Sequence, residues 1–488
     1  MKNYILLISI LFSVSLFSQN EDRVWYFGAN GVGIDFRDCR PEVITNSESG
    51  TFEGSVSICD ATTGDLLFYS TGTKIVDSTF NTMPNGLNIG NGNSGTQNTI
   101  VRKPGSNTVF YYFTTDIQGG NIVGPDPAAN GLSYAIIDMT LNGGLGDVVS
   151  HHNPIKDISN CEKLTAIRHA NGIDVWLIAH EFNNNHFFVY LIDESGVNLT
   201  PSVYSVGPDI IAYQSTVYAD SNFDAIGELK ASPDGSKIAF TTLYNGITSL
   251  FDFDNLTGAI TNAVELDLEG FGGYGMSFSP DNQKLYIGCV DTTDFSESIN
   301  SQLVQFDLSS GIPEVIQDSK EIINSCLTCS YRSLKLAPNG KIYCAKSPTL
   351  IESESLAVIN EPNNLGALCE YEHEGLYLEG RYGSWGLNNI METNNFCTEN
   401  ENQGFNEEFQ KTLVELSYDN YTSSLFFDCS VQHAEVKLFD INGRVVKQMN
   451  LDEGSSSLKL ESLQNGVYIA FVFIEGQPTL SKLKFAKY

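Results

Sequence analysis

The sequence predicts an all-β protein in which a β-propeller is followed by a small immunoglobulin-like β-sandwich. A short strand-turn-strand pattern recurs along most of the chain, and long amphipathic helical patterns are scarce. The 488 residues include 43 glycines, as expected where many strands are joined by tight turns. Hydrophobic residues make up 41% of the chain and aromatic residues 11%, so the chain can bury a large core.

The clearest copy of the pattern is Glu228–Gly258. Strands are predicted at Leu229–Ala231, Lys237–Thr242 and Ile247–Asp252, with a turn at Ser232–Gly235 between the first two. Proline presets φ in such a turn, aspartate bonds its own backbone, and glycine supplies a positive φ. Strands this short cannot bury both faces of a sheet alone, so the unit predicts further copies of itself.

Five other copies occur at intervals of roughly 45–65 residues, the range of propeller blades once loops are included. Their first strands are Gly54–Asp60, Asn98–Lys103, Lys163–His169, Tyr274–Ser279 and Arg332–Ala337. A seventh copy is split between the two ends of the region. Arg381–Ile390 supplies its first strand, and Val24–Gly28, Gly33–Phe36 and Glu42–Thr45 supply the rest. Such pairing closes a ring and removes exposed edges. We therefore predict a propeller over residues 22–397 with seven blades, leaving six or eight open.

The propeller region also resembles a known group of proteins. Its opening V-W-Y-F-G-A-N-G-V-G-I-D-F is followed by E-G-S-V-S-I-C-D-A-T-T-G-D-L-L-F-Y-S-T-G and then by M-P-N-G. These pieces and their spacing are similar to a recurrent propeller region of exported proteins from Bacteroidetes-type bacteria. The resemblance implies a fold and a location rather than an activity.

Residues 1–18 are predicted to be a signal peptide. Lys2 is the charged end, residues 5–17 are the apolar stretch, and Ser18-Gln19 is the cleavage point. An uncleaved membrane anchor is the alternative, but the apolar run is too short to favour it. No other window is long and apolar enough to span a membrane. No cysteine follows the cleavage point, so a lipoprotein anchor is not expected.

After Cys397 the composition changes, and residues 398–411 are predicted to be a linker. A compact β pattern fills residues 412–488. Its hairpin K-L-F-D-I-N-G-R-V-V-K (437–447) turns around Ile441-Asn442-Gly443, a favoured two-residue-turn context. S-L-Q-N-G-V-Y-I-A-F-V (462–472) and a basic end, K-L-K-F-A-K-Y, follow.

These motifs resemble the C-terminal sorting domain, type A, of the type IX secretion system, and the resemblance rests on Asp440, Asn442, Gly443, Arg444, Gly466, Tyr468 and Lys487. It implies that the signal peptide takes the chain into the periplasm and that the type IX machinery is a partner of the tail. The cell surface or the medium is the destination, and the tail is cut off on the way. Tyr418-Asp419-Asn420-Tyr421 stands where the family usually has N-P. An ordinary immunoglobulin-like module is the alternative.

Charge and cysteine content narrow the possible partners. With 27 basic and 59 acidic residues, the net charge is −32. This charge disfavours nucleic acid and anionic membranes as partners.

Ten cysteines in an exported chain permit disulfides, whose pairing cannot be read from the sequence. Cys326-Leu-Thr-Cys329 is a lone C-x-x-C, so a local disulfide or two unrelated thiols is favoured over zinc.

Candidate binding residues lie where the first strands begin, because propellers bind ligands at the mouth of the central channel. They are Glu53, Gln97, Asn98, Glu162, Lys163, Glu228, Lys230, Tyr274, Arg332, Arg381, Tyr382 and Trp385. Their carboxylates and amides could hold Ca²⁺, which takes six to eight oxygen ligands. The two arginines could clamp a carboxylate or sulfate, and the aromatic rings could stack on a sugar or peptide. The alternative is the polar lining that any channel mouth has.

Three functions are compatible with these features. The leading hypothesis is a secreted or surface-displayed binding or adhesion module for a glycan or protein ligand. The second is a metal-dependent hydrolase or lyase with Glu53, Glu162 and Glu228 as metal ligands. The third is a structural component of the cell surface or the motility machinery. The sequence contains no G-x-S-x-G, P-loop, H-E-x-x-H or Rossmann fingerprint, so we lean against an enzyme and assign no catalytic residue, metal or other cofactor.

Overall fold

The computed structural model describes most of the chain. The described residues are 20–28, 30–47, 50–90, 98–115, 131–156, 160–211, 223–291, 300–347, 353–397, 414–419, 422–429, 434–440, 444–451, 454–474 and 477–487. The chain forms two compact units, one of Met1–Asn363 with Glu370–Glu399 and one of Asn364–Cys369 with Asn400–Tyr488. The predicted signal peptide and linker lie outside the described residues. No described helix is long and apolar enough to cross a membrane.

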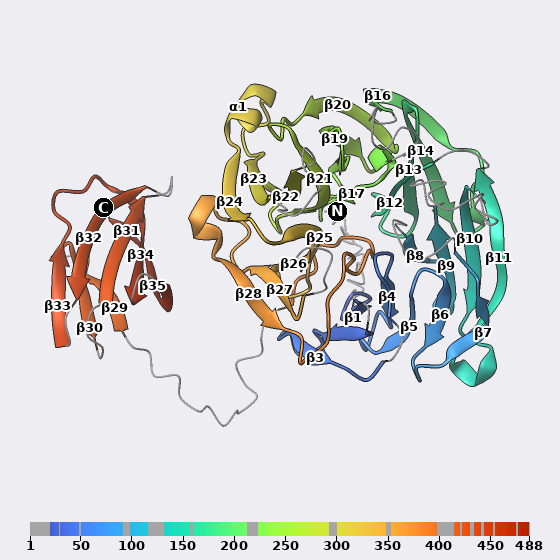
Figure 1. Cartoon of the computed structure of the whole chain (residues 1–488), viewed down its shortest axis with the longest axis horizontal. Coiled ribbons are helices and arrows are strands. Elements are labelled where there is room, and N and C mark those ends of the chain that lie inside the picture. Colours follow the sequence, from blue (N-terminus) through green and yellow to red (C-terminus); the bar gives the residue numbers. More distant parts are fainter. Residues whose placement is uncertain are drawn as a thin grey trace, which may run out of the picture. The chain divides into compact units, whose positions relative to one another are not determined.

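The first unit consists of antiparallel sheets that follow one another along the chain, as the repeats predict (Figure 1). In chain order the strands are β1 (Val24–Phe27), β2 (Val32–Asp35) and β3 (Glu42–Ile44); β4 (Val56–Cys59), β5 (Leu66–Ser70), β6 (Lys74–Asp77) and β7 (Thr82–Leu87); β8 (Asn98–Arg102), β9 (Val109–Thr114), β10 (Leu132–Asp138) and β11 (Asp147–Lys156); β12 (Asn160–Arg168), β13 (Val175–Glu181), β14 (Asn184–Asp193), β15 (Gly196–Val197) and β16 (Ser202–Ile210).

The remaining strands of this unit are β17 (Leu229–Ala231), β18 (Lys237–Thr241), β19 (Thr248–Asp254) and β20 (Ala259–Glu265); β21 (Phe271–Phe278), β22 (Lys284–Asp291), β23 (Ser301–Asp307) and β24 (Glu321–Cys326); β25 (Ser330–Leu336), β26 (Ile342–Ser347), β27 (Ser355–Ile359) and β28 (Tyr371–Tyr377). One short helix, α1 (Pro313–Asp318), lies between β23 and β24. The described residues of this unit thus form seven sheets, and the number of blades stays a prediction.

The sheets are arranged as in a β-propeller. The first strands β4, β8, β12, β17, β21 and β25 each contact the next one in this series, so they line the centre. Hydrophobic clusters fill the space between successive sheets. One such cluster joins Phe187 of β14 to Phe240 and Phe251 of the following sheet. Because each sheet buries its faces against its neighbours, the short strands gain a core that none of them could form alone.

The predicted turn at Ser232–Gly235 is present. Gly235 has φ +67°, and the carboxylate of Asp234 accepts a hydrogen bond from the amide of Ser236 at 2.9 Å. In the next sheet Asn282 takes the place of this glycine with φ +62°. Asparagine tolerates the left-handed region better than other residues with a side chain. The two turns therefore share a left-handed residue at this position, although it is glycine in one turn and asparagine in the other.

Segment 381–390 occupies the inner position between β25 and β4, but it is not the predicted strand. It forms isolated bridges, Ser353 with Gly383 and Ser55 with Asn388, and no ladder with β1. The amide of Ser333 donates to the carbonyl of Trp385 at 3.0 Å. Gly383, Ser384 and Gly386 interrupt the strand pattern here, and side-chain bonds replace the ladder. The predicted pairing of 381–390 with the N-terminal strands is therefore corrected to a central segment between two inner strands.

Buried polar contacts fix this closing segment to the start of the unit. The side-chain amide of Asn388 donates to Asp22 at 2.7 Å. The ammonium group of the fully buried Lys335 lies 3.4 Å from the carboxylate of Asp22 and 2.9 Å from that of Glu392. A disulfide, Cys39–Cys397, adds a covalent link between the same two ends. Of the two alternatives for Cys326 and Cys329, the structure has the local disulfide.

The second unit is the predicted two-sheet sandwich. Its strands are β29 (Val414–Asp419), β30 (Ser424–Cys429), β31 (Ala434–Asp440), β32 (Val445–Leu451), β33 (Gly454–Lys459), β34 (Gly466–Ile474) and β35 (Gln477–Lys487). One sheet has the order β29-β30-β33 and the other β32-β31-β34-β35. Leu425 and Phe427 of the first sheet share a core with Val436, Leu438 and Val472 of the second.

Candidate functional site

A small cavity of about 40 Å³ lies among the beginnings of the inner strands. Five residues that the sequence places at the channel mouth line it: Glu53, Asn98, Glu162, Glu228 and Tyr274. Each of them lies in the first half of an inner strand or just before one. The propeller arrangement brings these positions together, since all first strands run in parallel around the centre. A volume of this size accommodates single small groups such as water, a hydroxyl or an ammonium group.

Glu228 is held by groups from three sheets. Its carboxylate accepts hydrogen bonds from the hydroxyl of Ser333 at 2.5 Å and from the amide of Met276 at 3.0 Å. The ammonium group of Lys230 lies 3.8 Å away and also donates to Asn389 at 3.1 Å. Burial raises the pKa of Glu228, while Lys230 opposes the rise. The carboxylate is thus fixed in position at the cavity wall.

Glu53 begins a second network, which includes two predicted aromatic residues. The hydroxyl of Tyr274 donates to the carboxylate of Glu53 at 2.6 Å. The guanidinium of Arg332 lies 3.5 Å from the ring centroid of Trp385 and 5.2 Å from that of Tyr274. Burial lowers the pKa of Arg332 to about 10, so it stays charged at neutral pH. Arg332 and Trp385 therefore form a cation–π stack behind the cavity lining.

Lys163 has a different role from the one the sequence suggests. Its ammonium group is fully buried and donates to the carbonyl oxygens of Ala225 and Ile226, at 3.1 and 3.2 Å. Burial lowers the pKa of Lys163. Its contacts join β12 to the segment before β17, so Lys163 acts as a structural link rather than a lining residue.

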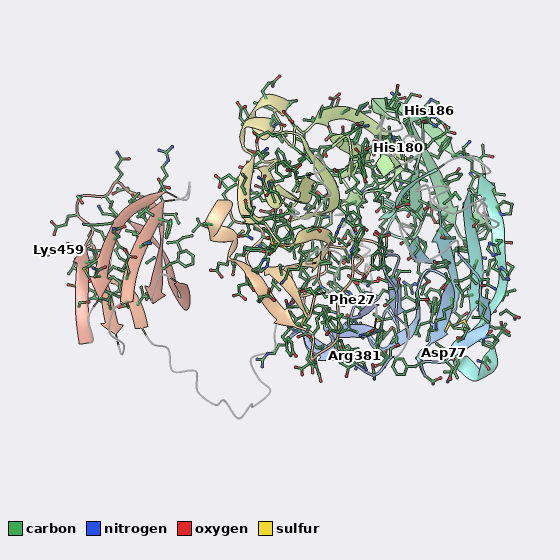
Figure 2. The ribbon with its side chains drawn as sticks, in the orientation of Figure 1. Phe27, Asp77, His180, His186, Arg381 and Lys459 are labelled. Carbon is green, nitrogen blue, oxygen red and sulfur yellow. A yellow bond between two sulfur atoms is a disulfide. The ribbon has the colours of Figure 1, made fainter. Side chains whose placement is uncertain are left out.

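Of the remaining candidates, Arg381 and Tyr382 do not join the site. Arg381 donates to the backbone carbonyls of Asn30 and Thr45, both at 3.0 Å, on the side of the unit where β1–β3 lie (Figure 2). It therefore does not meet Arg332, and the anticipated clamp of two arginines is absent. Gln97 lies outside the described residues. Tyr382 is not among the residues that line the cavity, and its backbone carbonyl lies close to Gly28.

The three glutamates do not form the metal site of the second hypothesis. Among the described residues, one group of three potential ligands has its donor atoms within 4.8 Å of one another, and this group is Cys326, Cys329 and His373. Glu53, Glu162 and Glu228 line one cavity without converging in this way. Glu53 instead accepts a hydrogen bond from Tyr274, and Glu228 accepts hydrogen bonds from Ser333 and Met276.

Sequence reasoning missed Ser333 and Asn389, which also line the cavity. Ser333 binds a residue 105 positions away, and Asn389 binds one 159 positions away. The available signal was that Ser333 lies in a predicted first strand and Asn389 in segment 381–390. The direction of the Asn389 side chain could not be predicted, because that segment is irregular.

The sorting-motif residues form a connected set in the second unit. Asp440 and Arg444 flank the predicted turn; the Asp440 carboxylate accepts from the amide of Arg444 at 3.0 Å. Asn442 and Gly443 lie outside the described residues. Gly466 pairs with Lys487 across β34 and β35. The ammonium group of Lys487 donates to the backbone carbonyls of Glu461 and Leu463, so it closes the turn before β34.

Tyr468 fixes the same turn from the other side. Its hydroxyl donates to the carbonyl of Gln464 at 2.8 Å. Residues 420–484 match the family described as the secretion system C-terminal sorting domain. The second unit is a type IX sorting domain of type A. It provides the contact with the type IX machinery and indicates export through the periplasm to the cell surface or the medium.

No curated protein matches the chain. Among solved structures, a putative 6-phosphogluconolactonase from Bacteroides uniformis is 12% identical, with a TM-score of 0.39 and coverage of 90% of this chain and 100% of that chain. PorZ from Porphyromonas gingivalis, described as an essential bacterial surface component of the type IX secretion system, is also 12% identical. Its TM-score is 0.30, and the match covers 96% of this chain and 74% of that chain. These distant similarities support no conclusion about activity.

Proposed function

We propose that the propeller is a binding module for a glycan or protein ligand, displayed on the cell surface or released by the type IX system. The sorting domain supports the location. The observation that supports binding is the cavity at the centre of the propeller, where buried carboxylates from separate sheets face a common space. A closed ring with fixed side chains is a preorganised site, which reduces the entropy lost on binding.

The small cavity volume constrains the ligand. It admits one protruding polar group, such as a sugar hydroxyl or the ammonium group of a lysine side chain, while the rest of the ligand stays outside. Glu53, Glu162 and Glu228 favour a hydrogen-bond donor or a cation over an anion. The net charge of −32 also favours a cation over an anion as the ligand.

Glycan and protein arrays with the purified passenger, residues 19–405, test this proposal. We expect at least one ligand on a broad panel, and Glu228→Gln should weaken its binding about tenfold or more because the cavity loses a charge. Glu269→Gln is the matched control, since Glu269 is exposed and pairs with Lys320. Absence of any ligand on the panel, or equal affinity of the two variants for one, would contradict the proposal.

A further inference from the structure

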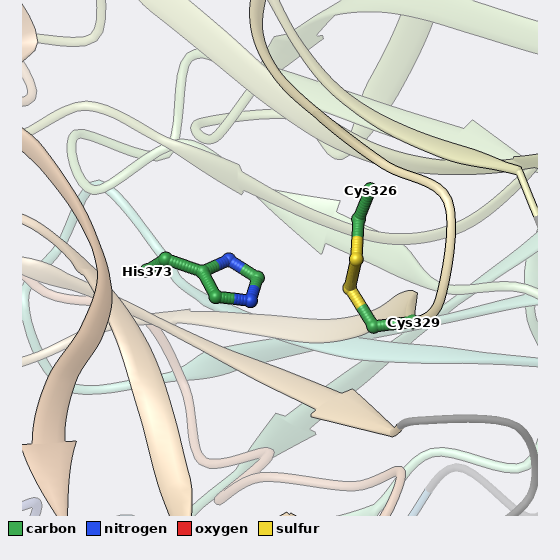
Figure 3. Close-up of side chains that lie close together, drawn as sticks. All are labelled: Cys326, Cys329 and His373. Atoms are coloured by element: carbon green, nitrogen blue, oxygen red, sulfur yellow. A yellow bond between two sulfur atoms is a disulfide. The ribbon is translucent and has the colours of Figure 1, made fainter.

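Cys326, Cys329 and His373 form a cluster separate from the central cavity, and the close-up shows the imidazole facing the disulfide (Figure 3). The two cysteines flank the loop between β24 and β25, and His373 lies on β28. One sulfur from each cysteine and one ring nitrogen all lie within 4.8 Å of one another. Two thiolates and an imidazole are a common ligand set for zinc, with Cys-x-x-Cys as the usual spacing.

The imidazole of His373 is held in the orientation that a metal ligand needs. Its Nδ1 lies 2.7 Å from the hydroxyl of Tyr371, which lies 2.9 Å from that of Tyr331. The side-chain amide of Asn324 donates to Tyr331. Zinc-binding histidines usually hydrogen-bond through the nitrogen that does not bind the metal, which fixes the ring. Here Nδ1 has that partner. Nε2 lies 3.7 Å from the carboxylate of Glu374, beyond hydrogen-bond distance, so it can turn to a metal.

The loop that joins the two buried cysteines lies at the surface, since Leu327 is 70% exposed.

We propose that reduction of the Cys326–Cys329 disulfide creates a Cys2His binding site for a thiophilic divalent cation such as Zn²⁺. Two equivalents of a thiol reductant supply two electrons and two protons and become a disulfide, while Cys326 and Cys329 become thiols. Zn²⁺ then binds both sulfurs and Nε2 of His373, and the two thiol protons leave to solvent. Water fills the fourth position. The oxidised chain does not bind the ion at this place.

Zinc titration of the chain from Gln19 to Tyr488 tests the site. The chain is reduced anaerobically with a phosphine, which is removed, and is then titrated against a chromophoric zinc chelator. We expect the reduced chain to bind one equivalent more than the reduced Cys326→Ser/Cys329→Ser variant. The same titration without reduction should show no such difference. Because both reduced chains keep all other cysteines, the comparison isolates this pair.

The histidine is tested separately. In the reduced chain, His373→Gln should weaken binding at this site at least tenfold, and Tyr371→Phe should weaken it to a smaller extent. His186→Gln is the matched control, because it removes another partly exposed histidine of the same unit. When Co²⁺ replaces Zn²⁺, the spectrum should show thiolate-to-cobalt charge-transfer bands and the bands of a tetrahedral site. His373→Gln should alter these bands, and His186→Gln should not. Equal zinc stoichiometry in the first comparison, or equal affinity of the two histidine variants, would overturn the proposal.

Discussion

His180 of β13 is a fully buried imidazole (Figure 2). Its Nδ1 donates to the carbonyl of Glu181 at 2.6 Å. Its ring packs against Phe187 and Phe240, with centroids 4.5 and 5.3 Å apart. Burial, followed by the nearby Lys163, lowers the pKa of His180 to about 3. The folded unit therefore holds this side chain neutral.

This pKa predicts acid sensitivity. Between pH 6.5 and about 3 the unfolded chain binds a proton at His180 and the folded chain does not, so stability falls as the pH falls through this window. The loss from one such group is at most about 1.4 kcal/mol per pH unit. Denaturant unfolding of the passenger at several pH values measures it. His180→Phe should flatten the slope between pH 6 and 4, and an unchanged slope would contradict the assignment.

At the same scale, the sequence located several cavity residues but not their partners. Glu53, Glu162 and Glu228 could be placed because each stands where a first strand begins. Ser333 and Asn389 could not, because their contacts depend on the closure of the ring by an irregular segment. Arg381 was placed at the mouth by its position in a predicted strand that does not form, and it binds the backbone near β2 and β3 instead.

At the scale of elements, segment 381–390 decides how the ring closes. An added Cβ on Gly386 would lie 1.6 Å from the carbonyl oxygen of Glu53, because the two backbones approach closely there. The nearby Gly383 has more room, since its added Cβ would meet its closest atom, on Leu378, at 3.3 Å. Neither glycine has a positive φ, so the two positions differ in space rather than in backbone conformation.

These two glycines give a matched pair of variants. Gly386→Ala should destabilise the passenger by at least about 3 kcal/mol, because the closing segment has to move away from Glu53. Gly383→Ala should cost about 1 kcal/mol or less. Thermal or denaturant unfolding of the two variants measures the difference. Equal stability of the two variants would show that the close contact of residues 53 and 386 does not hold the ring closed.

At the scale of the whole molecule, the sequence predicted the two units and their order, since each rests on local patterns. The disulfide Cys39–Cys397 could not be predicted, because ten cysteines allow many pairings and these two are 358 residues apart. Closure of the ring brings them together.

The central claim is that the tail directs export of the propeller. The most direct measurement deletes residues 413–488 in a bacterium with a type IX secretion system and follows the propeller by cell fractionation. The signal peptide remains, so we expect the truncated protein to accumulate in the periplasm while the full chain reaches the cell surface or the medium. Arrival of the truncated protein at the surface or in the medium, in the same amount as the full chain, would contradict the account.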